Sequence, residues 1–382
     1  MQMFWERGRR LAQAGRARAG RARAGRVFCG VLALWVGVMA FSPQRNIPTT
    51  LTERTPILID CDPGGDDVLA IGLAAGTALL DVRGITLCSG AGTLAQTGRS
   101  GLTAATYFAL HCPVALGSTR NSAGEAVVWG EDTGPTGAGN LVLPFGGEED
   151  FDPRPAWELM YETAVQEGGA LQILCLGPLT NLARALEEHP DLPQYIQRVV
   201  FSAGSVSLTE NGAVAGVGSD ANGPADPAAL QKVLASGIPL VMIDASISLG
   251  DHGTQKDLWT LFASQPRLFD ALWSYWDEKG KRNFAAGTLP LDGIAAVSLL
   301  IDETTLVLKP ADLGYCEGPV TGLDGEPLDG RGRVTVISAA EGGSPHRVAV
   351  ACAMWDWQGK TAPAPVVLLH QCRNLLGSAA AL

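Results

Sequence analysis

Ile57-Leu58-Ile59-Asp60-Cys61-Asp62-Pro63-Gly64-Gly65-Asp66-Asp67 is the stretch that decides the fold: a short apolar run followed at once by four aspartates with Pro and Gly between them. Such a run, bounded by Pro and Gly, is typical of a buried strand that ends in a tight turn. Clustered carboxylates repel one another unless a cation, protons or hydrogen-bond donors compensate. Hard cations such as Ca²⁺ or Mg²⁺ prefer oxygen ligands of this kind. The stretch therefore predicts a metal-dependent site, and the alternative is an acidic turn whose aspartates cap the next helix.

The rest of the chain alternates short apolar, β-branched runs with helical stretches. This alternation predicts an α/β fold with an open, mostly parallel central sheet, a Rossmann-like core and helices on both faces. Ligands of such sheets bind beyond the carboxyl ends of the strands, which is where the aspartates fall. The expected strands are 57–60, 82–87, 114–116, 171–176, 199–202 and 240–244, and the expected helices are 66–75, 93–110, 155–166, 179–188 and 227–235.

Length and composition describe one large globular domain. The chain has 382 residues, 46% of them hydrophobic and 18% charged, with a formal net charge of −11. The first 26 residues carry eight Arg and one Glu, so the remainder is at about −18. An acidic body argues against nucleic-acid binding, which needs Lys and Arg to neutralise phosphates. The eight Cys form no C-x-x-C pair, so they indicate neither a zinc site nor a dense disulfide framework.

The N-terminal segment is expected to be a separate object. Residues 1–50 combine an Arg-rich repeat with an apolar run at 27–41, which suits a signal-peptide core better than the ~20 residues of a spanning helix. The rivals are a short signal anchor, an organelle transit segment and a start assigned too far upstream. The protein is accordingly expected to be secreted or anchored to a membrane through 27–41, or cytoplasmic if the start is misassigned. Residues 51–382 are expected to form a single domain.

The C-terminal part has a different pattern. Asp324-Gly325 and Asp329-Gly330 are hairpin-type turn signals, and they are followed by strand-like runs at 333–338 and 347–352. Glycine-rich stretches at 134–139 and 204–223 are interpreted as loops over the site.

Four sequence blocks together resemble the inosine/uridine-preferring nucleoside hydrolases. Asp60-Cys-Asp62-Pro-Gly-Gly-Asp66-Asp67 is similar to that family's Asp-x-Asp-Pro-Gly-x-Asp-Asp signature. The other three blocks, in family order, are Leu176-Gly-Pro-Leu-Thr-Asn181-Leu-Ala183, Asn222-Gly-Pro-Ala-Asp226-Pro227 and Leu291-Asp292-Gly-Ile-Ala295. The resemblance implies a nucleoside-hydrolase-like domain that acts on a small-molecule nucleoside and forms a homo-oligomer.

The resemblance also implies a role for individual residues. Asp62, Asp67 and Asp292 would bind Ca²⁺ through their side chains, and the backbone carbonyl of Leu176 would add another oxygen. Asp62 would double as the general base toward the attacking water. Asp66 would hydrogen-bond a ribose hydroxyl and Asn222 would bind the sugar. Taken alone, Asp292 would be interpreted as a helix N-cap.

The chain departs from the family at positions that bind the nucleoside base and the outer part of the ribose. Leu291 stands where the family has a His proposed to protonate the leaving base, and Ala91 stands where it has an Asn. Asp220 replaces a sugar-binding Glu. Help for the leaving group is then expected from an aromatic ring, with Trp129 or Trp276 as candidates, which gives a purine-leaning preference. Ordinary core packing is the alternative for Trp276.

Three function classes follow. The leading hypothesis is Ca²⁺-dependent hydrolysis of the N-glycosidic bond of ribonucleosides to ribose and free base. An aspartate-nucleophile phosphatase also places Asp-x-Asp after a first strand, but Pro63-Gly64 follows Asp62 where those enzymes have Gly-Thr. The third is a nucleoside- or ribose-binding protein with reduced catalysis, or a hydrolase of a non-standard N-riboside, which Leu291 and Ala91 motivate.

Overall fold

The computed structural model describes residues 54–128, 147–203, 205–208, 214–218, 221–244, 292–316, 320–321, 327–328, 333–336, 346–355 and 361–362. All of them belong to one compact unit, Glu53–Leu382. The expected loop at 134–139 lies outside these residues, as do the N-terminal segment 1–50 and its apolar run 27–41. Within the described part of the chain, no helix combines the length and apolarity needed to cross a bilayer.

The core of the fold is a parallel sheet in which β1 (Thr55–Cys61) occupies a central position. β1 pairs in parallel with β2 on one side and with β4 on the other, and β3, β5 and β8 continue the parallel pattern outward. The order β8-β5-β4-β1-β2-β3 reverses direction beside β1, as in doubly wound sheets. The predicted α/β class is confirmed. The bounds of the other strands are β2 Leu80–Leu87, β3 Val114–Leu116, β4 Leu171–Cys175, β5 Ile196–Phe201 and β8 Leu240–Ile243.

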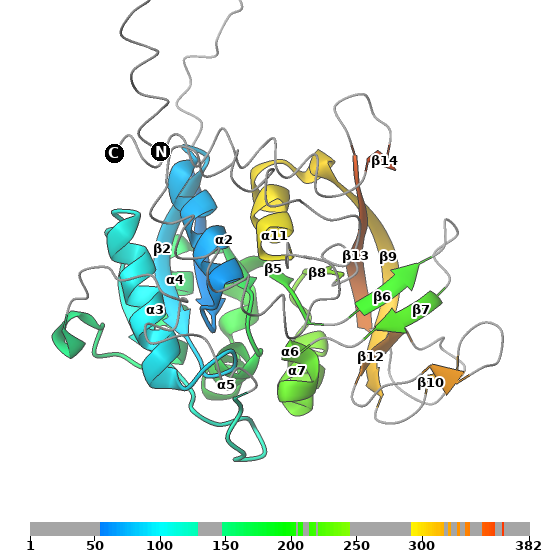
Figure 1. Ribbon diagram of the computed structural model, residues 1–382, viewed down its shortest axis with the longest axis horizontal. Coiled ribbons are helices and arrows are strands. Elements are labelled where there is room, and N and C mark those ends of the chain that lie inside the picture. Colours follow the sequence, from blue (N-terminus) through cyan, green and yellow to red (C-terminus); the bar gives the residue numbers. More distant parts are fainter. Residues whose placement is uncertain are drawn as a thin grey trace, which may run out of the picture. The chain divides into compact units, whose positions relative to one another are not determined.

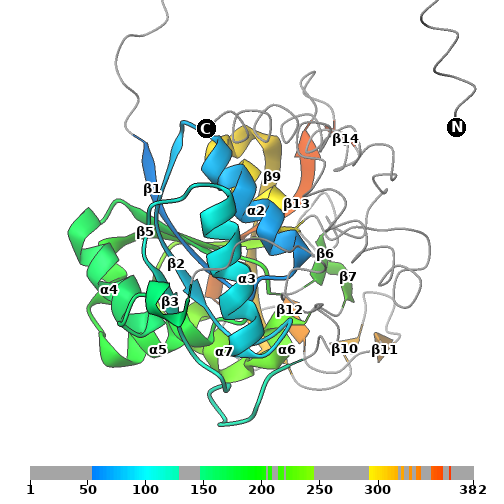
Figure 2. The same cartoon turned by 60° about the vertical axis from the view of Figure 1, so that its left-hand side comes forward.

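Helices cover both faces of this sheet because its strands are apolar on both sides (Figure 2). Along β1, Ile57 and Ile59 join the core beneath α2, α3 and α11, whereas Leu58 joins the core beneath α4, α5 and α7. Side chains that alternate along a strand thus reach two separate cores. The helices are α2 Gly65–Gly76, α3 Leu94–Tyr107, α4 Ala156–Glu167, α5 Thr180–Glu188, α7 Pro227–Leu234 and α11 Asp292–Ile301, with the short α6 at Asn222–Ala225.

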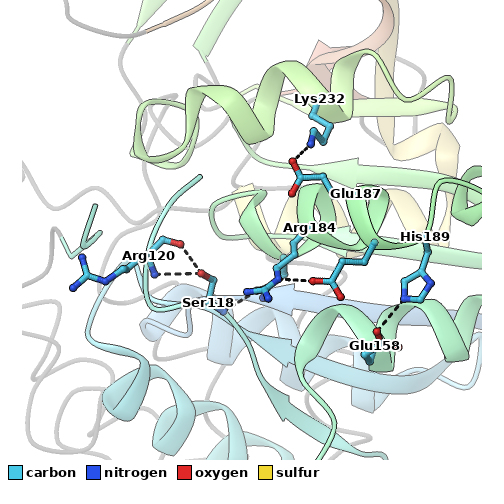
Figure 3. A network of polar contacts seen from close by, with 9 residues as sticks. Ser118, Arg120, Glu158, Arg184, Glu187, His189 and Lys232 are labelled. Carbon is cyan, nitrogen blue, oxygen red and sulfur yellow. Dashed lines mark hydrogen bonds and ion pairs between the residues drawn. The ribbon is translucent and has the colours of Figure 1, made fainter. Parts of the chain in front are cut away.

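Polar contacts join α4, α5 and α7 at their outer edges (Figure 3). Lys232 of α7 pairs with Glu187 of α5, and His189, which follows α5, lies 3.1 Å from Glu158 of α4. Exposed pairs of this kind contribute at most about 1 kcal/mol each. The apolar core beneath them therefore accounts for most of the packing free energy on this face.

An antiparallel part extends the sheet beyond β8, as seen on the right of Figure 1. β13 (His346–Trp355) pairs in parallel with β8 and antiparallel with β9 (Leu306–Cys316), and β12 (Arg333–Val336) continues the edge. β14 (Thr361–Ala362) pairs with the far end of β13, and β10 (Val320–Thr321) pairs with β11 (Pro327–Leu328). The strand-like runs expected at 333–338 and 347–352 correspond to β12 and β13. The sequence did not predict β9, because Lys309-Pro310 interrupts its apolar run and proline argues against an interior strand.

The prediction of a loop at 204–223 is wrong in part. Within 204–223 the structure forms a hairpin of β6 (Ser205–Leu208) and β7 (Val214–Gly218), followed by the start of α6. The alternation Ser-Val-Ser-Leu in β6 is a strand pattern. The abundance of glycine in this stretch concealed that pattern.

Candidate active site

The predicted site residues that the structure describes all stand at the carboxyl ends of strands or at the first turns of the helices that follow. Asp62 comes directly after β1, and Asp66 and Asp67 lie in the first turn of α2. Acidic groups at a helix start interact favourably with the helix dipole. Gly64 precedes α2 and is confined by its neighbours, because a Cβ there would lie 3.0 Å from Asp66 Oδ1. The turn therefore brings several carboxylates to one place.

Asp62 is buried between two loops that belong to neighbouring strands. Its Oδ2 accepts a hydrogen bond from the backbone nitrogen of Ala91 at 2.5 Å, in the loop after β2. On the other side, a Cβ on Gly177 would lie 2.5 Å from Asp62 Oδ1, so the turn after β4 passes directly against the carboxylate. Burial raises the pKa of Asp62 well above its ordinary value. The Ala91 hydrogen bond opposes that shift, and the neighbouring charge of Asp66 adds to it.

Asp67 and Asp292 are brought together although they lie far apart in the sequence. Burial raises the pKa of Asp67 well above its ordinary value, and the negative charges of Asp66, Asp62 and Asp292 raise it further. The two residues are near each other because α11 packs against α2: a Cβ on Gly293 would lie 3.3 Å from the Cβ of Ala70. The small residue at 293 therefore lets the first turn of α11, which carries Asp292, approach the first turn of α2.

Asn222 connects the two remaining strand ends. Its Nδ2 donates to the carbonyl oxygen of Leu176 at 2.6 Å and to the carbonyl oxygen of Ser202 at 2.8 Å. Both amide hydrogens are thereby used, so Oδ1 is the atom that Asn222 can offer to a ligand. The Ser202 hydroxyl in turn donates to Asp292 Oδ2 at 2.6 Å. These bonds tie β4, β5, α6 and α11 into one arrangement.

Asp60, near the end of β1, connects this strand with β2 and with helix α5. Its Oδ1 accepts from Thr86 Oγ1 at 2.7 Å and from Asn181 Nδ2 at 2.8 Å. Burial raises the pKa of Asp60 to about 7, although both hydrogen bonds oppose the shift. Its Oδ2 is buried with no hydrogen-bond partner among the described residues. Asp60 therefore joins the end of β1 to β2 and to α5 through its hydrogen bonds.

The donor set suits a hard cation in kind. Asp62, Asp67 and Asp292 offer carboxylate oxygens, Leu176 offers a carbonyl oxygen, and the carboxylates destabilise one another's charged forms. A divalent cation would relieve that repulsion. Among the residues described, however, no group of three or more Asp, Glu, His or Cys side chains is arranged so that it could hold a metal ion. These residues therefore fit a divalent cation by the chemistry of their oxygen atoms and by the clustering of their negative charges.

The sequence did not predict that Ser202 and Ala91 contact the acidic cluster, and it gave no role to Asn181. Ser202 was expected only as the last residue of a strand, and Ala91 only as a lost side chain, whereas its backbone nitrogen contacts Asp62. Asn181 belongs to the second sequence block but had no role assigned. Their position at strand ends was the available signal, since side chains there face the ligand edge of a parallel sheet. Three predicted residues, Asp220, Trp129 and Trp276, lie outside the described part of the chain, as does Leu291.

Comparison with known proteins agrees with this geometry. The model of the family "inosine-uridine preferring nucleoside hydrolase" matches residues 57–369. The pyrimidine-specific ribonucleoside hydrolase RihA of Escherichia coli strain K12 is 35% identical over 196 residues, which are 50% of this chain and 61% of that protein. The chain thus matches about three fifths of the length of this relative.

Solved structures share the fold. A plant nucleoside hydrolase superposes with a TM-score of 0.68 at 21% identity, covering 83% of this chain and 98% of that one. A purine-preferring ribonucleoside hydrolase from Gardnerella vaginalis gives 0.68 at 22% identity, with 86% and 100% covered. Since the family model extends from the first strand through the antiparallel strands and includes every described residue of the acidic cluster, the chain belongs to the inosine-uridine preferring nucleoside hydrolase family.

Proposed function

We propose that this protein hydrolyses the N-glycosidic bond of ribonucleosides, giving ribose and a free base, and that it does so with Ca²⁺ bound. The observation that carries the proposal is the convergence of Asp62, Asp67 and Asp292 at the carboxyl ends of the strands. A buried acidic cluster of this kind has little structural value by itself, because each carboxylate destabilises the charge of the next. Family membership supports the same reaction.

Asp62 is the proposed general base. The backbone nitrogen of Ala91 fixes one of its oxygens, which directs the carboxylate without placing a positive side chain beside it. In the proposed reaction, Asp62 takes the proton of the water that attacks the sugar.

Asp66 and Asn222 are the proposed contacts to the ribose. A carboxylate accepts hydrogen bonds from sugar hydroxyls, which suits the half-buried Asp66 in the first turn of α2. The amide group of Asn222 already donates twice to backbone carbonyls, so a sugar hydroxyl would donate to its Oδ1. Asp220 is a further proposed contact to the sugar.

The carboxylates of Asp62, Asp67 and Asp292, with the carbonyl oxygen of Leu176, would hold Ca²⁺. A bound divalent cation supplies positive charge that orients the sugar hydroxyls and makes the attacking water more acidic. The protein would contribute the placement: Asp67 and Asp292 stand at two helix starts, and Asp62 and Leu176 follow directly after two strands.

The proposed base preference leans toward purines, with Trp129 or Trp276 stacking on the leaving base. The names of the related proteins point in both directions, since RihA is pyrimidine-specific and the Gardnerella vaginalis enzyme is purine-preferring. Leu291 favours a second candidate, a binding protein with reduced catalysis or a hydrolase of a non-standard N-riboside, because leucine cannot donate a proton to the leaving base.

A hydrolysis panel tests the proposal. The purified full chain is incubated with inosine, guanosine, adenosine, uridine and cytidine, with Ca²⁺ or with a chelator, and both reducing sugar and free base are measured. We expect release of both products that the chelator abolishes. The variant Asp67→Asn should lower the rate by a factor of about 100 or more, whereas Asp81→Asn, the same change at an exposed ion pair, should not. Full activity of Asp67→Asn would refute the metal site, and absence of turnover with every substrate would favour the binding protein.

We further propose that residues 51–382 act as a single domain within a homo-oligomer, and that the segment 1–50 directs the chain to secretion or to a membrane anchor. A small-molecule nucleoside is the proposed partner, and nucleic acid is not. Size-exclusion chromatography with light scattering checks the assembly. N-terminal sequencing of the mature protein checks the segment.

A further inference from the structure

Ser202 contacts Asp292, Asn222 and Cys175, but the proposed reaction gives it no role. It follows β5 and is almost fully buried, with 2% of its surface exposed. Its backbone is held on both sides, because its nitrogen donates to the carbonyl oxygen of Cys175 at 3.0 Å and its own carbonyl accepts from Asn222 Nδ2 at 2.8 Å. Its hydroxyl is therefore presented from a fixed position.

That hydroxyl donates to Asp292 Oδ2 at 2.6 Å. A hydrogen bond from a hydroxyl to an ionised carboxylate is shorter and stronger than one between neutral groups. The bond restricts rotation of the Asp292 carboxylate. Asp292 in turn lies near Asp67, with which it interacts electrostatically.

We propose that Ser202 is a positioning residue: its hydroxyl sets the orientation of the Asp292 carboxylate, so that Asp292 serves as a cation ligand together with Asp62 and Asp67. The inference deepens the proposed function and rests on it. Groups that hydrogen-bond a metal ligand from behind typically change metal affinity by a factor of 10–100 when removed. Ser202 has the features of such a group, since it is buried, rigid and bonded to one carboxylate oxygen.

The test compares Ser202→Ala with two reference variants of the full chain. Ser100→Ala is the matched control: it removes a fully buried serine hydroxyl of α3 that has no hydrogen-bond partner among the described residues. Asp67→Asn is the positive control for loss of the cation site. Ca²⁺ affinity is measured by calorimetric titration of chelator-treated protein, and the rise in melting temperature with Ca²⁺ is measured in parallel.

We expect Ser202→Ala to weaken Ca²⁺ binding by a factor of about 10 or more, and Ser202→Thr, which keeps the hydroxyl, to bind more tightly than Ser202→Ala. Nucleoside hydrolysis by Ser202→Ala should need more Ca²⁺ for half-maximal rate and should recover at saturating Ca²⁺. A purely structural role for Ser202 would leave that Ca²⁺ dependence unchanged. If Ser202→Ala does not fold, Ser202→Cys carries the same expectation, because a thiol is a weak donor.

The outcomes separate the inference from the proposed function. Ca²⁺ affinity of Ser202→Ala within about twofold of the parent, with Asp67→Asn no longer binding, overturns the role of Ser202 and leaves the metal site standing. Unchanged Ca²⁺ binding by Asp67→Asn overturns the metal site itself. Equal weakening in Ser100→Ala and Ser202→Ala also overturns the inference, because it would show a general response to loss of a buried hydroxyl.

Discussion

Asn181 Nδ2 donates a hydrogen bond to Asp60 Oδ1 at 2.8 Å, and thereby joins the first turn of α5 to the end of β1. The same nitrogen reaches the carbonyl oxygen of Leu87 at 3.2 Å, and Asn181 Oδ1 accepts from the backbone nitrogen of Ser118 at 3.0 Å. One fully buried amide therefore connects the ends of β1 and β2 and the loop after β3. The acidic cluster lies directly above this connection.

Replacing Asn181 should destabilise the protein more than removing the other donor to Asp60. Asn181→Ala leaves Ser118 N without its side-chain partner and removes one of the two donors to the buried Asp60 Oδ1, and each buried group left unpaired costs about 1–3 kcal/mol. We expect a loss of ~3 kcal/mol or more in the free energy of unfolding. Thr86→Val removes only the hydroxyl that donates to Asp60 and should cost ~1–2 kcal/mol. Urea unfolding measures both, and equal losses would contradict the connecting role of Asn181.

Gly177→Ala should impair the site through steric contact alone. The new Cβ would lie 2.5 Å from Asp62 Oδ1 and 3.0 Å from the Asp62 backbone nitrogen, so the proposed base must move. A displacement of about 1 Å at a reacting group can lower the rate by a factor of about 100. Gly84→Ala is the matched control, since its Cβ would meet no atom closer than 3.5 Å. Steady-state hydrolysis rates check the pair, and wild-type turnover by Gly177→Ala would show that Asp62 is not confined there.

Asp226 should prove important for the placement of Asn222. Its Oδ2 accepts from the nitrogen and the hydroxyl of Ser122 and from Thr180 Oγ1, each at 2.8 Å, and its Oδ1 caps α7 through Ala229 N. Asp226→Asn turns one acceptor into a donor among these donors. We expect a loss of ~2–3 kcal/mol in the free energy of unfolding and a raised KM for nucleosides.

The control for Asp226 is Asp302→Asn, at an exposed cap whose carboxylate accepts from Thr304. That change should cost less than ~1 kcal/mol. Thermal unfolding and KM determinations compare the two variants. A larger loss in the free energy of unfolding for Asp302→Asn than for Asp226→Asn would argue against the structural role of Asp226.

The stability of the protein should depend on pH through Asp152. Hydrogen bonds from the Arg154 side chain lower the pKa of Asp152 in the folded state below its ordinary value. Stabilisation by this carboxylate is therefore present above its unfolded-state pKa, near 4, and is lost as the pH falls through the lower folded-state pKa. Arg154→Met should reduce the difference in stability between pH 6 and pH 2.5 by up to about 1 kcal/mol, because the pair is partly exposed. Urea unfolding at the two pH values measures this, and an unchanged difference would count against the pair.

The sequence alone determined the fold class and most elements of the parallel core. Apolar runs such as 57–59 and 171–175 are short and bounded by turn residues, so local pattern and burial agree and predict strands. The strand β9 and the hairpin of β6 and β7 were missed for the opposite reason. Proline in β9 and glycine around the hairpin disfavour strands locally, and pairing with neighbouring strands overrides that preference.

The aspartate run likewise predicted a site after β1, because residues that are neighbours in a turn are also neighbours in space. The family resemblance already implied that Asp292 lies near Asp67, whereas the hydroxyl of Ser202 on Asp292 and the backbone nitrogen of Ala91 on Asp62 were decided by the tertiary structure. Each joins segments whose separation depends on how α11 packs on α2 and how adjacent strand ends align. Local sequence carries no information about those distances, since they are set by the packing of the whole sheet and its two helical layers.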